Sequence, residues 1–370
     1  MLKRTLCFIL LLSTCSLMAQ DDRHFQFAIK DTSRTYVRLL FAGDAMQHST
    51  QYNWAYNAHT KQYEYEANFR YLLPYIQESD INLVNFEATI GTPGHYSGYP
   101  YFRSPEAWLN ALAEAGFQVF ALANNHMLDG GKSGLMRTLQ KMSPYPHCGA
   151  YADTTQRRKE YPLLLEIDGI RIELFNCTYG TNGLTPVAPT RINYIETEEI
   201  QMDMERSMQD TTIDLRIFFI HWGTEYQLHH NAIQEGTAQW LADLGADLII
   251  GSHPHVVQDM EIRTAQDGRR VPVVYSLGNF LSNQRWENSN GGILATVDIS
   301  RATHRITAVD YVPFYVHKGY LNNQKDYYCI PTLDYTIGIL PFRLPSDSLQ
   351  QDLKSFHSAT VKRLGAALHP

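Results

Sequence analysis

Several apolar runs in this chain end at a side chain that can bind a metal or transfer a proton. The stretch "IIGSHPHVVQ", for example, leaves an apolar run and then places two histidines around one proline. The residues found at such ends are Asp44, Glu87, Asn125, His126, His221, His253 and His255. In open α/β sheets the carboxyl ends of the strands converge, so residues far apart in sequence can share one site. The pattern therefore predicts a layered α/β domain built around a common polar cleft.

Extended and helical patterns alternate along the chain from Thr35 onward. The predicted strands span 35–44, 81–87, 117–126, 161–180 with a turn at Asp168-Gly169, 214–223 and 246–255. The predicted helices span 66–80, 104–116, 130–142, 197–208 and 232–245. Ser104 is the expected N-cap of the second of these helices. Two late hairpins, 258–276 and 291–317, suggest a second sheet of antiparallel strands, and 346–368 can form an amphipathic helix.

The first residues have the form of a cleaved secretory signal, with Lys3 and Arg4 before the apolar run 6–12. We therefore expect a signal peptide over residues 1–19 and a secreted or periplasmic protein. An alternative interpretation takes "LSTC" as a lipobox with Cys15 acylated, which would anchor the protein at an outer surface. No later apolar segment approaches the roughly 20 residues of a spanning helix. No transmembrane segment is expected in the mature chain.

The remaining sequence predicts one large domain over 35–320, with an N-terminal arm at 20–34 and a C-terminal extension, 321–370, that packs on the domain. Removal of residues 1–19 takes away Lys3 and Arg4 and no acid, so the formal net charge moves from −7 to −9. An acidic surface argues against nucleic acid as a partner. The spacing of the three later cysteines, at 148, 177 and 329, fits no disulfide framework or zinc motif. One pair could form a disulfide, but three buried small hydrophobic residues are the simpler expectation.

The polar residues at the strand ends are chemically coherent as a set. Without His126 they comprise three histidines, two carboxylates and an amide oxygen, which suit a transition metal such as Mn, Zn or Fe. They are too rich in nitrogen for a Ca or Mg site, and they are numerous enough for two ions that share a carboxylate. In extended backbone His253 and His255 point to the same side, and Pro254 stiffens the pair. A single strand-end histidine, or Asp44 or Asp129 as a cap or turn residue, has an ordinary structural explanation; the set as a whole does not.

Six motifs occur in one order between about Val37 and Phe280: "FAGDAMQH", "NFEATIG", "ANNHMLDGG", "HWGTEY", "GADLIIGSHPHVVQDME" and "VVYSLGNF". Together they resemble the CapA family of capsule or poly-gamma-glutamate synthesis proteins. That family is similar to the calcineurin-like metallophosphoesterases. The resemblance implies an α/β fold, a four-layer αββα sandwich with mixed sheets.

The resemblance also implies roles for individual residues. The implied metal ligands are Asp44 and His255 for a first ion, Glu87 as a bridge, and Asn125, His221 and His253 for a second ion. His126 would assist the leaving group and Asp129 would orient it, while Ser276 and Asn279 would line the cleft. Metallophosphoesterases normally carry a histidine where this chain has Met46, and an aspartate where it has Glu87. His48 is an additional candidate ligand, and one or two divalent metals are expected.

Two functions fit these expectations. The first is a metal-dependent hydrolase in which a metal-bound hydroxide attacks a phosphoester or a gamma-glutamyl/amide bond of an extracellular or cell-envelope polymer. The second is a non-catalytic factor that binds a polyanion during capsule or poly-gamma-glutamate synthesis and export, with metal cations supplying the positive charge. With either function, the protein could belong to a membrane-bound capsule synthesis complex. A retained acid/base pair, His126 and Asp129, favours the hydrolase.

Overall fold

The structure is a computed structural model that describes residues 24–370, so the predicted signal peptide and Cys15 lie outside the described residues. Seven strands form the first large sheet, which we call sheet A. They are β1 His24–Phe27, β11 Leu163–Ile167, β12 Ile170–Thr178, β14 Leu215–His221, β15 Leu248–Ser252, β17 Arg270–Val274 and β16 Met260–Thr264, in spatial order. Strands β12, β14, β15 and β17 run parallel, whereas β11 and β16 are antiparallel to their neighbours β12 and β17. Sheet A is therefore mixed.

Eight strands form the second large sheet, sheet B, which is also mixed. They are β21 Gln324–Pro331, β20 Ile306–Leu321, β19 Gly291–Ser300, β2 Tyr36–Ala45, β5 Ile81–Asn85, β8 Val119–Ala121 and β9 His147–Cys148 in spatial order, with β18 Asn279–Leu281 beside β2. Three pairs of two-residue strands complete the set: β3 Tyr56–Asn57 with β4 Gln62–Tyr63, β6 Thr89–Ile90 with β7 Arg103–Ser104, and β10 Ala150–Tyr151 with β13 Arg191–Ile192.

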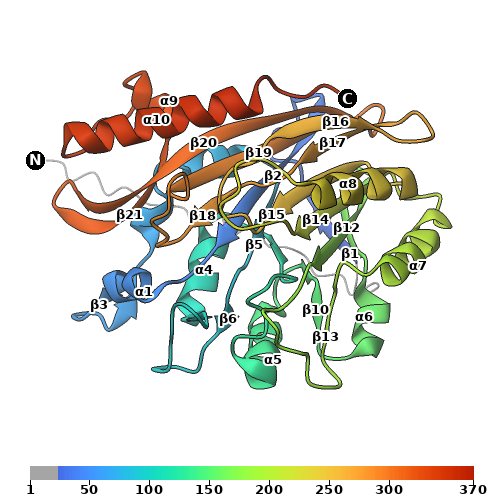
Figure 1. Cartoon of the computed structure of the whole chain (residues 1–370), viewed down its shortest axis with the longest axis horizontal. Coiled ribbons are helices and arrows are strands. Elements are labelled where there is room, and N and C mark those ends of the chain that lie inside the picture. Colours follow the sequence, from blue (N-terminus) through green and yellow to red (C-terminus); the bar gives the residue numbers. More distant parts are fainter. Residues whose placement is uncertain (1–23) are drawn as a thin grey trace, which may run out of the picture.

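The two large sheets pack face to face between layers of helices (Figure 1). The helices are α1 Ser49–Ala55, α2 Glu66–Phe69, α3 Leu73–Glu78, α4 Glu106–Ala115, α5 Gly131–Met142, α6 Thr154–Glu160, α7 Thr197–Met208, α8 Ala232–Leu244, α9 Thr332–Thr336 and α10 Asp347–Leu364. Between the sheets, Phe41 of β2 meets Phe219 of β14 edge to face at 5.7 Å. On the outer side of sheet B, Trp108 of α4 and Leu135 of α5 join one apolar cluster with Val84 of β5. The predicted four-layer α/β sandwich with mixed sheets is confirmed.

Several local predictions need correction. The helix expected over 66–80 is divided into α2 and α3, and Pro74 lies in the first turn of α3. Ser104 is not the N-cap of α4, because it lies in β7 and its hydroxyl donates to Thr89 O at 3.3 Å; Pro105 takes the cap position. The two late hairpins do not make a separate antiparallel sheet. One, β16–β17, extends sheet A, and the other, β19–β20, extends sheet B.

Segments at both ends of the described chain contribute strands to the large sheets, one to sheet A and one to sheet B. In the expected arm, β1 pairs in parallel with β11. In the expected extension, β21 forms the edge of sheet B, and α10 packs on β20 with Phe356 6.0 Å from the ring of Tyr315. The three described cysteines are buried free thiols, in agreement with the simpler expectation. No helix in the part of the chain that the structure describes is long and apolar enough to cross a membrane.

Candidate metal centre

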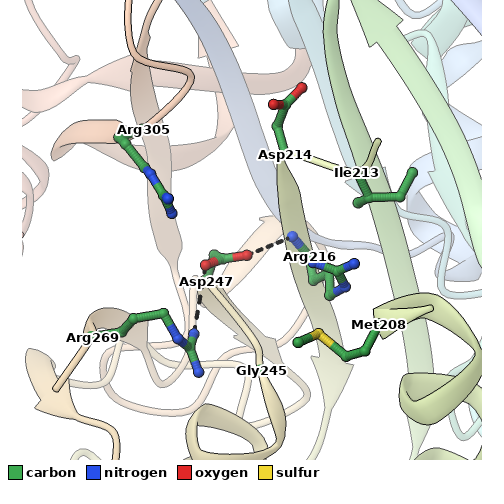
Figure 2. A pocket seen from close by; sticks show the side chains of 8 residues that line it. All are labelled: Met208, Ile213, Asp214, Arg216, Gly245, Asp247, Arg269 and Arg305. Atoms are coloured by element: carbon green, nitrogen blue, oxygen red, sulfur yellow. Dashed lines mark hydrogen bonds and ion pairs between the residues drawn. The ribbon is translucent and has the colours of Figure 1, made fainter. Parts of the chain in front are cut away.

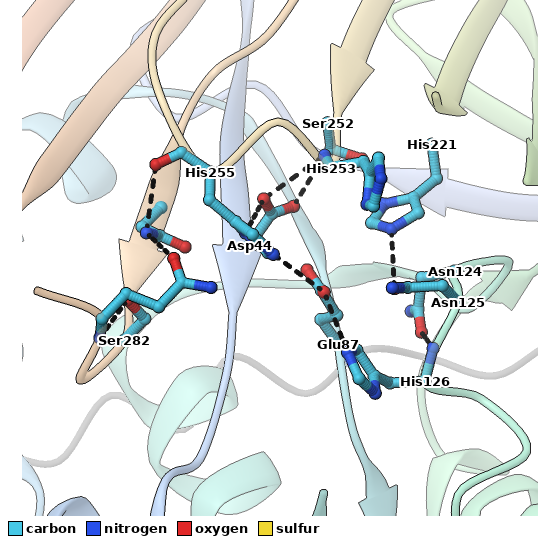
Figure 3. A network of polar contacts seen from close by, with 12 residues as sticks. Asp44, Glu87, Asn124, Asn125, His126, His221, Ser252, His253, His255 and Ser282 are labelled. Carbon is cyan, nitrogen blue, oxygen red and sulfur yellow. Dashed lines mark hydrogen bonds and ion pairs between the residues drawn. The ribbon is translucent and has the colours of Figure 1, made fainter. Parts of the chain in front are cut away.

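Strands from both sheets deliver the predicted ligands to one place. Asp44 lies near the end of β2, Glu87 follows β5, His221 ends β14, and His253 and His255 follow β15. All five side chains are buried. Figure 3 shows them pointing toward one another, with the segment after β8 that carries Asn125 and His126 beside them. The convergence expected at the carboxyl ends of the strands is therefore present, and it draws on both sheets.

Two carboxylates lie together at the centre of this cluster. Asp44 and Glu87 are both 0% exposed, and Asn85 Nδ2 donates to Asp44 Oδ1 at 2.8 Å and to Glu87 Oε2 at 3.3 Å. His255 Nδ1 lies 3.0 Å from Asp44 Oδ2, while its Nε2 lies 3.8 Å from Glu87 Oε1. Among the described residues, histidines are the only ion-pair partners of these two carboxylates, and no lysine or arginine reaches them.

The protonation of the two carboxylates reflects this shortage of positive charge. Burial, and then the charge of Asp44, raise the pKa of Glu87 well above its ordinary value. Burial also opposes ionisation of Asp44, but hydrogen bonds from His255 and Asn85 outweigh it and leave the pKa of Asp44 below its ordinary value. Glu87 Oε1 is buried without a hydrogen-bond partner. A divalent cation would satisfy that oxygen and balance the buried charge, so these donors fit the expected metal.

A second group of ligand atoms lies beside Glu87. His221 Nε2 is 3.0 Å from Asn125 Oδ1, and His221 Nδ1 is 2.9 Å from Ser252 Oγ. The ring of His253 lies 4.8 Å from that of His221, and His253 Nδ1 is buried without a hydrogen-bond partner. Burial lowers the pKa of His221 well below its ordinary value and lowers the pKa of His253 to about 3. Both imidazoles are therefore neutral, which is the form that binds metals.

His126 stands at the edge of this cluster in a fixed orientation. Its Nδ1 lies 2.7 Å from Asp129 Oδ2, which also accepts the N–H of Phe102 at 2.6 Å. The ring of Phe102 packs edge-on against His126 at 4.6 Å. His126 Nε2 lies 3.9 Å from Glu87 Oε1. The predicted pairing of Asp129 with His126 is thus present, and it leaves Nε2 on the side of the carboxylates.

The backbone of the histidine pair differs from the expected extended conformation. His253 has φ of 101° and His255 has φ of 59°, both in the left-handed region that non-glycine residues rarely enter. This bend lets the His253 N–H lie 3.3 Å from Asp44 Oδ2, while the His255 side chain contacts the same carboxylate. Asn279 Nδ2 donates to His255 O at 3.2 Å, so Asn279 supports the bent backbone. Backbone strain of this kind concentrates at functional sites.

Ser276 also holds backbone in place. Its hydroxyl donates to Val256 O at 2.8 Å, one residue beyond His255, and accepts the N–H of Gly278 at 3.2 Å. Both hydrogen-bond partners of this buried hydroxyl are therefore main-chain groups. Ser276 and Asn279, the residues expected to line the cleft, thus both make contacts that fix the loop carrying His255.

Met46 and His48 lie outside the groups of ligand atoms. Met46 is 1% exposed and belongs to the apolar cluster on the outer side of sheet B. His48 Nδ1 accepts the N–H of Asn283 at 3.2 Å, and its ring packs against Phe102 at 4.8 Å. Burial lowers the pKa of His48 to about 4. The structure gives His48 a structural contact that holds the 282–284 loop.

The sequence interpretation missed three residues near the centre. Asn85 bridges the two carboxylates, Ser252 contacts His221, and Glu225 brings a carboxylate oxygen within 4.8 Å of ligand nitrogens of His253 and His255. Asn85 precedes Glu87 by two residues, the spacing of side chains on one face of a strand, which could have indicated it. Glu225 lies inside the motif "HWGTEY", but nothing in that motif indicates that its loop folds back onto the histidine pair.

Two glycines permit the close approach of backbones beside the site. A Cβ atom on Gly43, next to Asp44, would lie 1.9 Å from Gly278 O. A Cβ on Gly251 would lie 2.0 Å from Tyr275 O. Since real Cβ atoms do not approach oxygen so closely, any other residue at either position would move a strand that carries ligands.

The opposite ends of β14 and β15 show a different chemistry. A cavity of about 180 Å³ lies there, lined among others by Arg216, Asp247 and Arg269 (Figure 2). Asp247 Oδ2 accepts the Arg216 N–H at 2.9 Å, and Arg269 Nη1 lies 3.5 Å from Asp247 Oδ1. Arg216 Nε donates to Ser207 Oγ at 2.7 Å. At this end the Asp247 carboxylate and the Arg216 guanidinium both have hydrogen-bond partners within the protein.

Residues 38–284 match the family of bacterial capsule synthesis proteins named PGA_cap. The chain belongs to this family. It is 27% identical over 262 residues to the capsule biosynthesis protein CapA of Bacillus anthracis, covering 68% of this chain and 62% of that protein. It is 25% identical over 257 residues to the PGA biosynthesis protein CapA of Bacillus subtilis, covering 65% of this chain and 63% of that protein. The match thus spans less than two thirds of these two PGA_cap relatives, and the expected family is confirmed.

Solved structures with a similar arrangement include a phosphatase from Mycoplasma pneumoniae, at 14% identity and a TM-score of 0.46, covering 76% of this chain and 94% of that chain. A hypothetical protein from Thermus thermophilus has 14% identity and a TM-score of 0.45, covering 75% of this chain and 99% of that chain.

Proposed function

We propose that this PGA_cap protein is a metal-dependent hydrolase that cleaves a phosphoester or a gamma-glutamyl/amide bond in a cell-envelope or capsular polymer. The observation that carries the proposal is the buried pair Asp44 and Glu87, which has no lysine or arginine partner among the described residues. Buried charges are normally paired or coordinate a metal. Bound metal would polarise the scissile group as a Lewis acid.

The ligand atoms would divide into two sets that share Glu87. Asp44 and His255 contact each other on one side, and His221 and Asn125 contact each other on the other side, where the ring of His253 also lies. Nitrogen and oxygen donors in these proportions suit Mn, Zn or Fe. The residues thus provide for one or two transition-metal ions.

His126 would handle the proton of the leaving group. Asp129 and Phe102 fix its ring, and its Nε2 lies on the side of the carboxylates. The carboxylate beside Nδ1 holds one tautomer and stabilises the cationic imidazole when it forms. From this position Nε2 would donate a proton to the departing oxygen or nitrogen and become neutral.

The names of the relatives favour a second candidate. Both curated relatives are named for biosynthesis of capsule or PGA rather than for its breakdown. In this alternative the same site, with its metals, binds a polyanion during assembly or export without turnover. A fixed acid/base pair has no evident purpose in such a clamp, so we place the hydrolase first.

Metal content and turnover measured on the same preparation test the proposal. We expect bound metal by mass spectrometry, with hydrolysis of a phosphodiester dye or of gamma-glutamyl peptides that falls about a hundredfold in His126→Ala. His304→Ala, a half-buried histidine paired with Asp214, is the matched control and should keep full activity. Stoichiometric metal without turnover on either substrate class would leave only the binding function. A protein without metal, unaffected by His253→Ala, would exclude both.

A further inference from the structure

We propose that Glu225 is a further ligand of the metal centre, acting with His253 and His255 from the solvent side; this rests on the metal-dependent function proposed above. One carboxylate oxygen of Glu225 and one ring nitrogen of each histidine lie within 4.8 Å of one another. The histidines are buried, whereas Glu225 is exposed. Of these three residues, the glutamate alone can reach a bound ion from outside.

The loop that carries Glu225 is fastened to the segment that carries the histidines. The Trp222 N–H donates to Ser252 O at 3.0 Å, and the Tyr226 N–H donates to Pro254 O at 2.8 Å. Farther along, Gln258 Nε2 donates to Gln227 O at 2.9 Å. Hydrogen bonds on both sides of Glu225 thus hold its backbone against the bend at Pro254. A backbone fixed in this way lowers the entropy that the loop would lose when Glu225 binds an ion.

The donors beside His255 leave room for a further ligand. Asp44, Glu87 and His255 would supply three donor residues to a transition metal held there, and such sites commonly have four or more ligands in all, with water among them. Met46 lies in an apolar cluster, and His48 belongs to neither group of ligand atoms that lie within 4.8 Å of one another. Neither residue takes the remaining position, whereas Glu225 offers a carboxylate oxygen in one group with His253 and His255.

The Tyr226 side chain is a neutral hydrogen-bond partner of Glu225 and does not balance its charge. No lysine or arginine forms an ion pair with it within the range 24–370, so its negative charge stands at the mouth of a site that already holds two buried acids. Like charges near one another are unfavourable unless a cation lies between them. A cation held by Glu225 and the histidines removes this repulsion.

Metal affinity of the full protein tests this role. We expect Glu225→Gln to weaken binding of one Mn²⁺ or Zn²⁺ by about tenfold or more, measured by calorimetry on metal-stripped protein. The matched control is Glu287→Gln, which removes the same charge from another exposed glutamate outside the ligand groups and should leave affinity unchanged. Glu225→Asp keeps the charge on a shorter side chain and should fall between the two.

The outcomes separate this inference from the function on which it rests. Equal affinity and stoichiometry in wild type and Glu225→Gln would overturn the role of Glu225 and leave the metal-dependent function standing. Equal weakening in Glu225→Gln and Glu287→Gln would also overturn it, because surface charge alone would then explain the effect. Absence of metal from the wild-type protein would overturn both.

Discussion

The two ends of β14 and β15 treat buried charge in opposite ways. At the amino ends, Asp247 is matched by Arg269 and by the N–H of Arg216, and the Arg216 guanidinium is bonded to α7. At the carboxyl ends, His253 Nδ1 and the neighbouring Glu87 Oε1 of sheet B are buried without a hydrogen-bond partner. Polar groups at the amino ends of these two strands thus have partners within the protein, whereas the cluster at their carboxyl ends contains buried atoms without hydrogen-bond partners.

This difference distinguishes charged groups that stabilise the fold from charged groups that are available to bind a ligand. Buried polar atoms in native proteins almost always have partners, so each exception requires an explanation. Both ends contain charged residues in clefts, and charge alone would not tell them apart. The buried atoms without hydrogen-bond partners do distinguish the two ends. They predict that substitutions at the two ends will have opposite consequences for stability and for metal binding.

The largest effect is expected for Glu87→Gln at the carboxyl ends. Loss of the shared carboxylate should weaken metal binding by about a hundredfold or more, with turnover falling in parallel. In the metal-free protein the same change should preserve or raise the free energy of unfolding, because it removes a buried carboxyl group whose ionisation is opposed by burial and by the charge of Asp44. Calorimetry with metal and denaturant unfolding without it measure the two quantities. A variant that binds metal normally would contradict the contrast between the ends.

A smaller effect of opposite character is expected for Asp247→Ala at the amino ends. It leaves the Arg216 N–H without its acceptor and removes an ion-pair partner of Arg269, and should lower the free energy of unfolding by about 2 kcal/mol. Metal content should not change. Asp267→Ala, which removes the exposed partner of Arg269, serves as the control and should cost less than about 0.5 kcal/mol. Loss of metal in Asp247→Ala would contradict the proposed difference between the amino ends and the carboxyl ends of β14 and β15.

Acid should distinguish the ends by the sign of its effect on stability. Burial lowers the pKa of His253 from its ordinary 6.5 to about 3, so the unfolded chain binds more protons below about pH 7. Metal-free protein should therefore lose about 2 kcal/mol from this residue between about pH 7 and 5. Burial raises the pKa of Asp247, so its contribution changes the other way and grows as pH falls toward the acid range. Denaturant unfolding across this range should give a shallower pH dependence for His253→Gln than for wild type.

Local patterns in the sequence predicted most of the fold. The helix expected over 197–208 is α7, and the hairpin expected at Asp168-Gly169 joins β11 and β12. These elements depend on periodicity and turn residues close together in the chain. The assignment of the late hairpins to sheets depends on pairing between distant strands, which periodicity does not encode. The division of 66–80 shows how a proline can end one helix pattern and begin another.

The candidate site was predictable to a similar depth. Strand ends indicated Asp44, Glu87 and His221 because polar residues interrupt apolar runs there, and these three bring ligand atoms within 4.8 Å of one another. The left-handed backbone of the histidine pair was not predictable, since contacts with Asp44 and Asn279 impose it from elsewhere in the chain. The place of Glu225 likewise depends on main-chain hydrogen bonds between two loops.

Gly43 gives the metal centre a mechanical vulnerability that its ligands do not have. At Gly43 the backbone of β2 lies so close to Gly278 that only a hydrogen atom fits on the Gly43 Cα. An added methyl group would lie 1.9 Å from Gly278 O. A methyl group at this position would push β2 away from Gly278 and move Asp44 away from His255, although every ligand residue would be unchanged. Substitution of a ligand removes one metal–ligand bond, whereas Gly43→Ala would displace the strand that carries Asp44. Gly43→Ala therefore belongs with the ligand variants in any mutational survey of the family.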